Sequence, residues 1–96
     1  MAKYECMYIV KPDMEDEART ALIQKFNDII TSNGGEIEKV DEWGKRKLAY
    51  PINYINDGYY VLVNFSADSQ LPAELERNLK ISDSVMRFIV VNLDKK

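Results

Sequence analysis

The chain has 96 residues, 46% of them hydrophobic, with 13 basic and 16 acidic side chains and a net charge of −3. This length predicts one domain covering residues 1–96, and the hydrophobic content is too high for a disordered chain. One cysteine and no histidine exclude an internal disulfide and remove the commonest general base and metal ligand, while the lack of a signal peptide or long apolar run predicts a cytoplasmic protein with no membrane association.

The charge is unevenly distributed along the chain. Residues 13–42 contain nine acidic and three basic side chains, whereas residues 43–96 contain eight basic and six acidic ones. This segregation predicts one surface that repels polyanions and another that tolerates them.

The first strand is predicted over residues 3–10, because tyrosine, isoleucine and valine favour a pleated sheet. Cys6 is interpreted as a small buried hydrophobe in preference to a reactive thiol, because no cationic neighbour is evident to lower its pKa. Alternation places Tyr4, Cys6, Tyr8 and Val10 toward the core, and Lys3, Glu5, Met7 and Ile9 on the opposite side.

A helix is predicted between Pro12-Asp13 and Asn33-Gly34-Gly35. The acidic residues at positions 13, 15, 16 and 17 suit its first turn, because the helix dipole favours negative charge there. We interpret this turn as a solvated helix start in preference to a partner-binding patch. Asparagine and glycine accept the left-handed conformation that ends a helix. The apolar stripe facing the core is predicted to be Ala18, Leu22, Phe26, Ile29 and Ile30.

The second strand is predicted over residues 36–50, with a bulge near Gly44 where the alternation slips. Ile37 and Val40 cannot both face one side without such an irregularity. Residues 51–58 are predicted to connect this strand to the next, with Asn56-Asp57-Gly58 as the turn. The third strand follows over residues 59–65, with Val61, Val63 and Phe65 inward and Tyr60, Leu62 and Asn64 outward.

A second helix is predicted to begin at residues 68–72, with Asp68 or Ser69 as its cap and Pro72 in its first turn. Lys80 lies favourably near its end. The last strand is predicted over residues 85–93. The buried stripe of the helix is Leu71, Leu75 and Leu79, and the strand places Met86, Phe88 and Val90 inward and Arg87, Ile89 and Val91 outward.

The order strand, helix, strand, strand, helix, strand is that of the ferredoxin-like α+β fold, βαββαβ. Because each crossover is right-handed, both helices are expected on one face of a four-stranded antiparallel sheet, which leaves the other face open. Aromatic, apolar and arginine side chains on an open face usually mark a contact site. The predicted open set is Met7, Ile9, Arg46, Leu48, Tyr50, Tyr60, Leu62, Arg87 and Ile89.

Two other interpretations of this region stay open. Lys45, Arg46 and Lys47 can be a strand edge that is charged against aggregation, and single exposed apolar residues are normal. Residues 58–65 partly match the glycine-aromatic signature of an RNA-recognition module, although Asp57 stands where a cation belongs. Base stacking on this face is therefore weakly supported. With more acids than bases, the chain is expected to bind RNA weakly alone and to gain from a basic partner.

No catalytic arrangement is recognisable in the sequence. It has no Cys-His or Ser-His pairing, no phosphate-cradling loop and no metal-ligand spacing. We therefore expect no enzyme activity, cofactor, bound metal or small-molecule substrate.

The chain resembles the bacterial small-subunit ribosomal protein S-six family over nearly its whole length. The matching stretches are Y-E-C-M-Y-I-V-K-P at 4–12, G-G-E-I-E-K-V-D-E-W-G-K-R-K-L-A-Y-P at 34–51, G-Y-Y at 58–60 and E-L-E-R-N-L-K-I-S-D-S-V-M-R-F at 74–88.

This resemblance implies a ferredoxin-like ribosomal protein of the translation machinery. Such a protein binds the central domain of small-subunit ribosomal RNA during assembly, as a heterodimer with ribosomal protein S-eighteen. The resemblance also implies two sets of contact residues. The RNA-binding set is Lys3, Lys45, Arg46, Lys47 and Arg87, and the partner-binding set is Arg46, Leu48, Tyr50, Tyr60, Leu62 and Ile89.

The leading hypothesis is therefore a non-enzymatic assembly protein that binds ribosomal RNA cooperatively with a basic partner. The alternative is a ferredoxin-like homodimer that buries the same face against itself or around a small ligand. Sedimentation of the purified chain separates the two, because a stable dimer without a partner favours the alternative.

Overall fold

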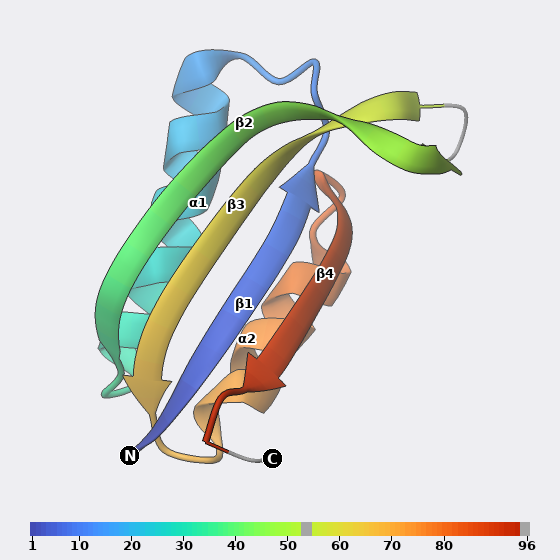
Figure 1. Ribbon diagram of the computed structural model, residues 1–96. Coiled ribbons are helices and arrows are strands. Elements are labelled where there is room, and N and C mark those ends of the chain that lie inside the picture. The colour runs from blue at the N-terminus through green and yellow to red at the C-terminus, as the bar shows by residue number, and fades with distance from the viewer. Residues whose placement is uncertain (53–54, 95–96) are drawn as a thin grey trace.

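The computed structural model describes residues 1–52 and 55–94 of the chain. The strands form one antiparallel sheet in the order β2-β3-β1-β4, which confirms the predicted ferredoxin-like arrangement (Figure 1). Within the described ranges, no helix is long and apolar enough to cross a membrane. The elements are β1 (Ala2–Val10), α1 (Asp16–Ser32), β2 (Glu36–Ile52), β3 (Ile55–Ala67), α2 (Leu71–Ile81) and β4 (Val85–Asn92).

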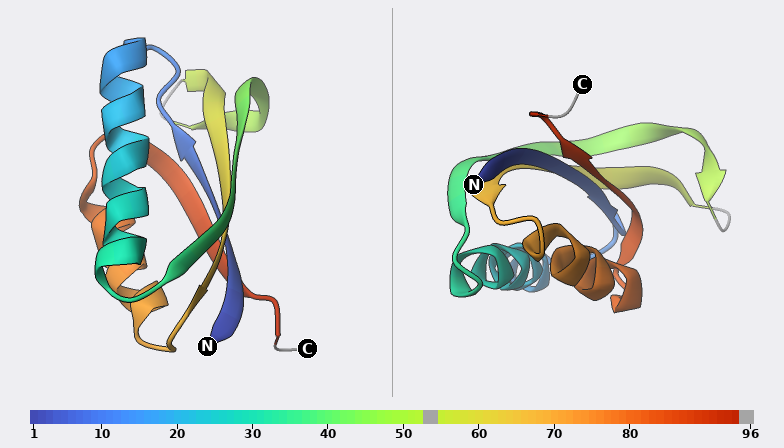
Figure 2. Two further views of the ribbon diagram at one scale, coloured as in Figure 1. Left: turned by 90° about the vertical axis from the view of Figure 1, so that its left-hand side faces the viewer. Right: turned by 90° about the horizontal axis from the view of Figure 1, so that it is seen from below.

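Both helices cover the same face of the sheet, and the opposite face carries no helix (Figure 2). The core lies between the two layers, where the ring of Tyr8 packs edge-on against Phe26 of α1 with centroids 5.2 Å apart. Tyr4 stacks on Phe65 at 5.5 Å in the same layer. The inward residues predicted for β1 and β3 are all buried: Tyr4, Cys6, Tyr8, Val10, Val61, Val63 and Phe65.

The buried stripe of α1 is shifted from the predicted one. Ala18 is exposed, whereas Ile23 is buried together with Phe26 and Ile30. The residue four positions before Ile23 is Arg19, so the covered face of the first turn carries an arginine where an apolar residue was expected. The prediction for Ala18 is wrong because the stripe begins with this long side chain.

Glycine ends α1 as predicted, but asparagine does not adopt the left-handed conformation. Gly34 has φ +84°, whereas Asn33 has φ −101°. The Gly34 N–H donates to the carbonyl of Thr31 at 3.2 Å, and the Asn33 side chain donates to the carbonyl of Ile29 at 2.7 Å. These two bonds occupy carbonyls that the end of a helix leaves without partners.

The hairpin formed by β2 and β3 is longer than predicted. Pairing continues through Lys47 with Asp57 to Ile52 with Ile55, so the predicted connection over 51–58 is wrong. The predicted turn at residues 56–58 lies inside β3. Gly58 is needed there because a Cβ atom at this position would collide with Cγ2 of Ile9.

Irregular pairing in β2 confirms the predicted bulge. The register shifts between Glu42 and Gly44, and Gly44 has φ +84°. A second shift, between residues 37 and 39, places Ile37 opposite Phe65 and Val40 opposite Val63. Both therefore face the helices, which the sequence allowed only with an irregularity.

The second half of the chain departs from prediction at two points. Neither Asp68 nor Ser69 caps α2 through its side chain; the cap position is Gln70. A register shift after Ile9 places Val85 opposite Val10, so Val85 packs on the core in the place predicted for Met86. The predicted stripe of α2 is confirmed, since Leu71, Leu75 and Leu79 are each at most 3% exposed.

Candidate macromolecular interface on the open sheet face

The face opposite the helices is built from alternate residues of the four strands. Residues paired across antiparallel strands point to the same side, so the register fixes which side chains are neighbours. The outward positions predicted for Tyr60, Leu62, Arg87 and Ile89 are confirmed by this pairing. From β4 to β2, one row is Ile89, Met7, Leu62 and Asp41, and the next is Arg87, Ile9, Tyr60 and Gly44.

A hollow at the β2 side of this face brings an aromatic pair next to a cation. It is lined by Asp41, Trp43, Arg46 and Tyr60. The Trp43 and Tyr60 rings stack with centroids 6.2 Å apart and 9° between their planes. Trp43 remains 40% exposed, and its indole N–H donates to Asp41 Oδ2 at 3.3 Å. This pair presents a flat aromatic surface beside a guanidinium group, a combination enriched at interfaces.

Trp43 was missing from the predicted site. Glu42 pairs with Val61 on the helix side and Gly44 pairs with Tyr60 on the open side, so Trp43 is the extra residue of the bulge. Alternation cannot assign such a residue to a face. The sequence feature that could have identified Trp43 was its position next to Gly44, the glycine that predicted the bulge.

Two side chains of the open face are buried although no helix covers them. Ile9 is 7% exposed and Leu48 is 8% exposed, although neither lies under a helix. The absent side chain of Gly58 leaves room for Ile9, and Leu48 Cδ2 would lie 3.4 Å from a Cβ built there. The hairpin extends across the end of β1 at this point (Figure 1). The expectation that Ile9 and Leu48 are exposed is therefore wrong: both lie beside Gly58, and these three residues form a small satellite cluster.

The predicted RNA-binding cations are divided between the two sides of the sheet. Arg46 pairs with Gly58 and Arg87 pairs with Ile9, which places both on the open side. Lys45 pairs with Tyr59 and Lys47 with Asp57, so these two lysines point to the reverse side of the hairpin. All four are exposed. Lys3, also exposed, is the second residue of β1 and lies on the open side opposite Ser66.

Carboxylates are interleaved with the cations of the open face. Lys39 Nζ lies 3.8 Å from Asp41 Oδ2, and Asp41 also accepts the hydrogen bond from Trp43. Glu5 pairs with Asn64 and Val91 on the same side. The face therefore has mixed charge and lacks the clustered cations of a surface that binds a polyanion by itself.

Other predicted features lie elsewhere or cannot be placed. Tyr50 belongs to β2, but its side chain is outside the described part of the structure. Cys6 is buried, as predicted, and burial raises the pKa of its thiol to about 12, so it stays protonated and unreactive at neutral pH. Among residues 1–52 and 55–94, no three histidine, cysteine or carboxylate side chains gather as a metal site would require.

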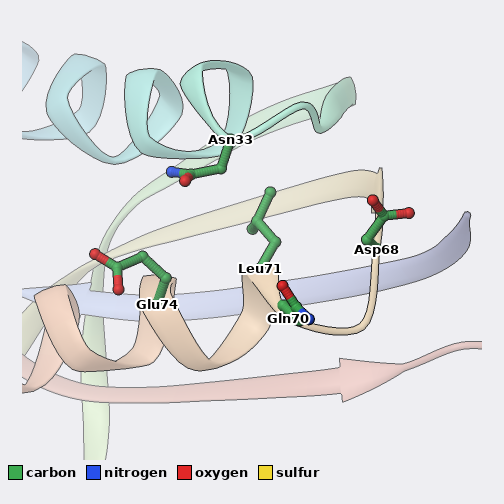
Figure 3. Close-up of a pocket in the computed structure, with 5 residues that line it drawn as sticks. All are labelled: Asn33, Asp68, Gln70, Leu71 and Glu74. Atoms are coloured by element: carbon green, nitrogen blue, oxygen red, sulfur yellow. The ribbon is translucent and has the colours of Figure 1, made fainter.

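A second hollow lies where the end of α1 faces the start of α2 (Figure 3). Its lining side chains are mostly polar, and two of them are carboxylates. No side chain lining it is cationic, so it offers nothing to attract an anion. The residues that line it are Asn33, Asp68, Gln70, Leu71 and Glu74.

Comparison with known proteins finds similarity over nearly the whole chain. The sequence profile of the family described as Ribosomal protein S6 matches residues 3–92. The small ribosomal subunit protein bS6 of Clostridium novyi is 55% identical over 95 residues, which cover 99% of this chain and all of that protein. The bS6 protein of Alkaliphilus oremlandii is 56% identical over the same length and coverage. The crystal structure of 30S ribosomal protein S6 from Thermotoga maritima matches with a TM-score of 0.90 at 33% identity, covering 95% of this chain and 86% of that one.

Proposed function

The chain belongs to the ribosomal protein S6 family and is a structural, non-enzymatic component of the small ribosomal subunit. We propose the following mode of binding there. It binds the central domain of small-subunit ribosomal RNA in cooperation with ribosomal protein S-eighteen. The open sheet face meets both, and two lysines on the reverse side of the β2–β3 hairpin add contacts to the RNA.

The observation that carries this proposal is the composition of that face. On the side of the sheet that has no helix, it exposes Trp43 at the β2 edge and Ile89 and Val91 at the β4 edge, at 40–58%. Between these edges, Leu62 and Met7 are only half-buried and join them into one apolar surface. A soluble protein rarely leaves such a patch uncovered unless another molecule covers it. Aromatic and arginine side chains, which this face also carries, are the types that dominate interface energies.

Charge supports the need for a partner. The cations of the open side stand next to carboxylates, as Lys39 does beside Asp41. RNA affinity depends on how many phosphates a surface neutralises, and mixed charge neutralises few. A basic partner docked on the apolar part of the face supplies the missing positive charge.

The residues proposed to contact RNA and those proposed to contact the partner lie on different parts of the surface, apart from Arg46, which belongs to both sets. We assign RNA contact to the exposed cations, of which Arg46 and Arg87 lie on the open side and Lys45 and Lys47 on the reverse side of the hairpin. Leu48 supports the surface from beneath, because it is 8% exposed. The proposed RNA set is Lys3, Lys45, Arg46, Lys47 and Arg87, and the proposed partner set is Arg46, Leu48, Tyr50, Tyr60, Leu62 and Ile89. We add Trp43 to the partner set because it is exposed and stacks on Tyr60.

A filter-binding titration tests the proposal. The central-domain RNA fragment is titrated with this chain alone, with the partner alone and with an equimolar mixture. We expect the mixture to bind at least about tenfold more tightly than this chain alone, which corresponds to about 1.4 kcal/mol of coupling. Equal affinity of the chain alone and the mixture contradicts cooperativity.

Charge reversal locates the surface. Arg46→Glu and Arg87→Glu are expected to weaken the ternary complex and to flatten its salt dependence, because each removes a cation near phosphate. The matched control is Arg77→Glu, which reverses an exposed arginine on α2, an element of the helix layer. If all three variants weaken binding equally, the open face is not the contact surface.

The homodimer alternative is tested by sedimentation of the free chain. A monomer at micromolar concentration agrees with a face kept for other partners. A stable dimer that buries Trp43 contradicts the proposal.

A further inference from the structure

The bulge of β2 is held from both sides by two consecutive residues of β3. Tyr60 faces the open side and stacks on Trp43. Tyr59 faces the helix side, where its hydroxyl donates to Oε1 of Glu42 at 2.8 Å. Since Glu42 and Trp43 are the residues at which the register shifts, both contacts act directly on the bulge.

The helix-side contact is anchored to α1. The guanidinium carbon of Arg19 lies 4.1 Å from the centroid of the Tyr59 ring, in cation–π geometry. Arg19 is itself fixed, because its Nη2 lies 2.6 Å from Oδ1 of Asp16 and its side chain is only 16% exposed. Burial and the contact with Glu42 raise the pKa of Tyr59, so its hydroxyl keeps the proton that it donates at neutral pH.

We propose that Arg19, Tyr59 and Glu42 form a clamp that positions Trp43 and Arg46 on the open face. The clamp ties the first turn of α1 through β3 to the bulge, and the bulge determines where the extra residue points. Arg46 follows two residues after Gly44 and lines the same hollow as Trp43. The three clamp residues are positioning residues: Tyr59 and Glu42 lie on the helix side of the sheet beside Arg19 of α1, and they act on Trp43 and Arg46 through the strand.

The bulge needs side-chain contacts to fix its orientation. A bulge inserts an unpaired residue and increases local twist, so its orientation is not fixed by the backbone ladder alone. Gly44 adds conformational freedom at this point, since it occupies the left-handed region at φ +84°. The contacts of Arg19 with the Tyr59 ring and of the Tyr59 hydroxyl with Glu42 remove that freedom before binding. Association then costs less conformational entropy, because the bulge is already ordered.

The local part of the inference is tested without RNA or partner. Trp43 is the one tryptophan of the chain, so its fluorescence reports on the bulge alone. Tyr59→Phe removes the hydrogen bond to Glu42 but keeps the ring under Arg19, and Arg19→Met removes the cation but keeps an unbranched apolar side chain. We expect acrylamide quenching of Trp43 and amide exchange at residues 44–47 each to rise by about twofold or more in both variants, equivalent to about 0.4 kcal/mol of local ordering.

The matched control is Arg77→Met. Arg77 and Glu74 form the same type of pair on α2, with the same spacing of three residues and the same 2.6 Å separation as Arg19 and Asp16. This variant should leave Trp43 quenching unchanged. Unchanged quenching and exchange in Tyr59→Phe and Arg19→Met, or an equal rise in Arg77→Met, overturns the clamp.

The functional part rests on the proposed function and is measured separately. In the ternary RNA titration, Tyr59→Phe is expected to weaken binding by about two- to tenfold, the cost of ordering one or two interface side chains. Weaker binding with an unchanged Trp43 signal overturns positioning as the cause. A mobile Trp43 with unchanged binding confirms the clamp but contradicts the assignment of Trp43 and Arg46 to the contact surface.

Discussion

The two faces of the sheet use the same strands for different purposes. On the helix side of β3, Val61, Val63 and Phe65 are 0–1% exposed. On the other side of the same strand, Tyr60, Leu62 and Asn64 are only half-buried. Stability is therefore concentrated on the covered face, since an antiparallel sheet needs only one packed side. The open face is therefore free to carry side chains selected for contact.

Truncation of one residue on each face of β3 should change stability by very different amounts. Phe65→Ala removes a fully buried ring that stacks on Tyr4, and should lower the free energy of unfolding by about 3–5 kcal/mol. Leu62→Ala, which lies three residues before Phe65 in the same strand and faces the open side, should cost less than about 1.5 kcal/mol. Urea unfolding measures both. Similar losses at the two positions contradict the conclusion that stability is concentrated on the helix side of the sheet.

Leu48 is an exception to this division between the faces, because it is buried although it lies on the open side. Leu48→Ala should cost about 2 kcal/mol, at the low end of the range for core leucines, since its cluster with Ile9 and Gly58 is small. The measurement is urea unfolding with Leu62→Ala as the matched leucine. A loss below that of Leu62→Ala indicates that the satellite cluster does not form in solution.

The covered face also predicts how stability depends on alkaline pH. Burial raises the pKa of Cys6 from 9.0 to about 12, so the neutral thiol stabilises the fold fully below pH 9. Above pH 9 the unfolded state ionises first, and the contribution is lost as pH rises toward 12. Relative to Cys6→Ala, the unmodified chain should lose about 1.4 kcal/mol per pH unit in this window. A constant difference between the two chains from pH 8 to 11 shows that Cys6 is not buried.

The smallest expected change in stability belongs to the cations of the open face. Arg46→Glu should alter the free energy of unfolding by less than about 0.5 kcal/mol, because Arg46 is exposed. Thermal denaturation beside Arg77→Glu provides the check. A drop of several degrees in Tm for Arg46→Glu alone means that Arg46 stabilises the hairpin and that its effect on binding is indirect.

Periodicity was sufficient for most of the fold. Alternation identified the buried sides of β1 and β3, and the three leucines of α2 recur at helical spacing, so pattern and burial agree there. Gly44 also marked the bulge, because glycine was the residue on which alternation slipped. These elements depend on short-range patterns that the sequence carries directly.

Three of the errors share a physical cause, which is contact between segments far apart in the chain. Gly58 suggested a turn, but its role is to admit Ile9 from another strand. Ala18 suggested the start of a buried stripe, but Arg19 takes that face by packing on Tyr59 of β3. Leu48 was expected to be exposed, because alternation does not reveal the twist of the hairpin on which its burial depends. No local pattern contains these contacts.

The candidate site was predicted in outline and missed at its most exposed ring. The side of Tyr60, Leu62, Arg87 and Ile89 followed from alternation. Trp43 did not, because a bulged residue belongs to neither face until the register is known.

Side-chain footprinting of the assembled complex shows which face of the sheet is covered by RNA and partner. Hydroxyl-radical oxidation of the chain, free and bound to the RNA fragment with its partner, compares reactive residues on the two faces. We predict strong protection of Trp43, Tyr60 and Met7 on the open face, and unchanged oxidation of Met14, which precedes α1 beside the helix layer. Protection of Met14 with unchanged oxidation of Trp43 and Tyr60 would place the contact on the helices and contradict the account.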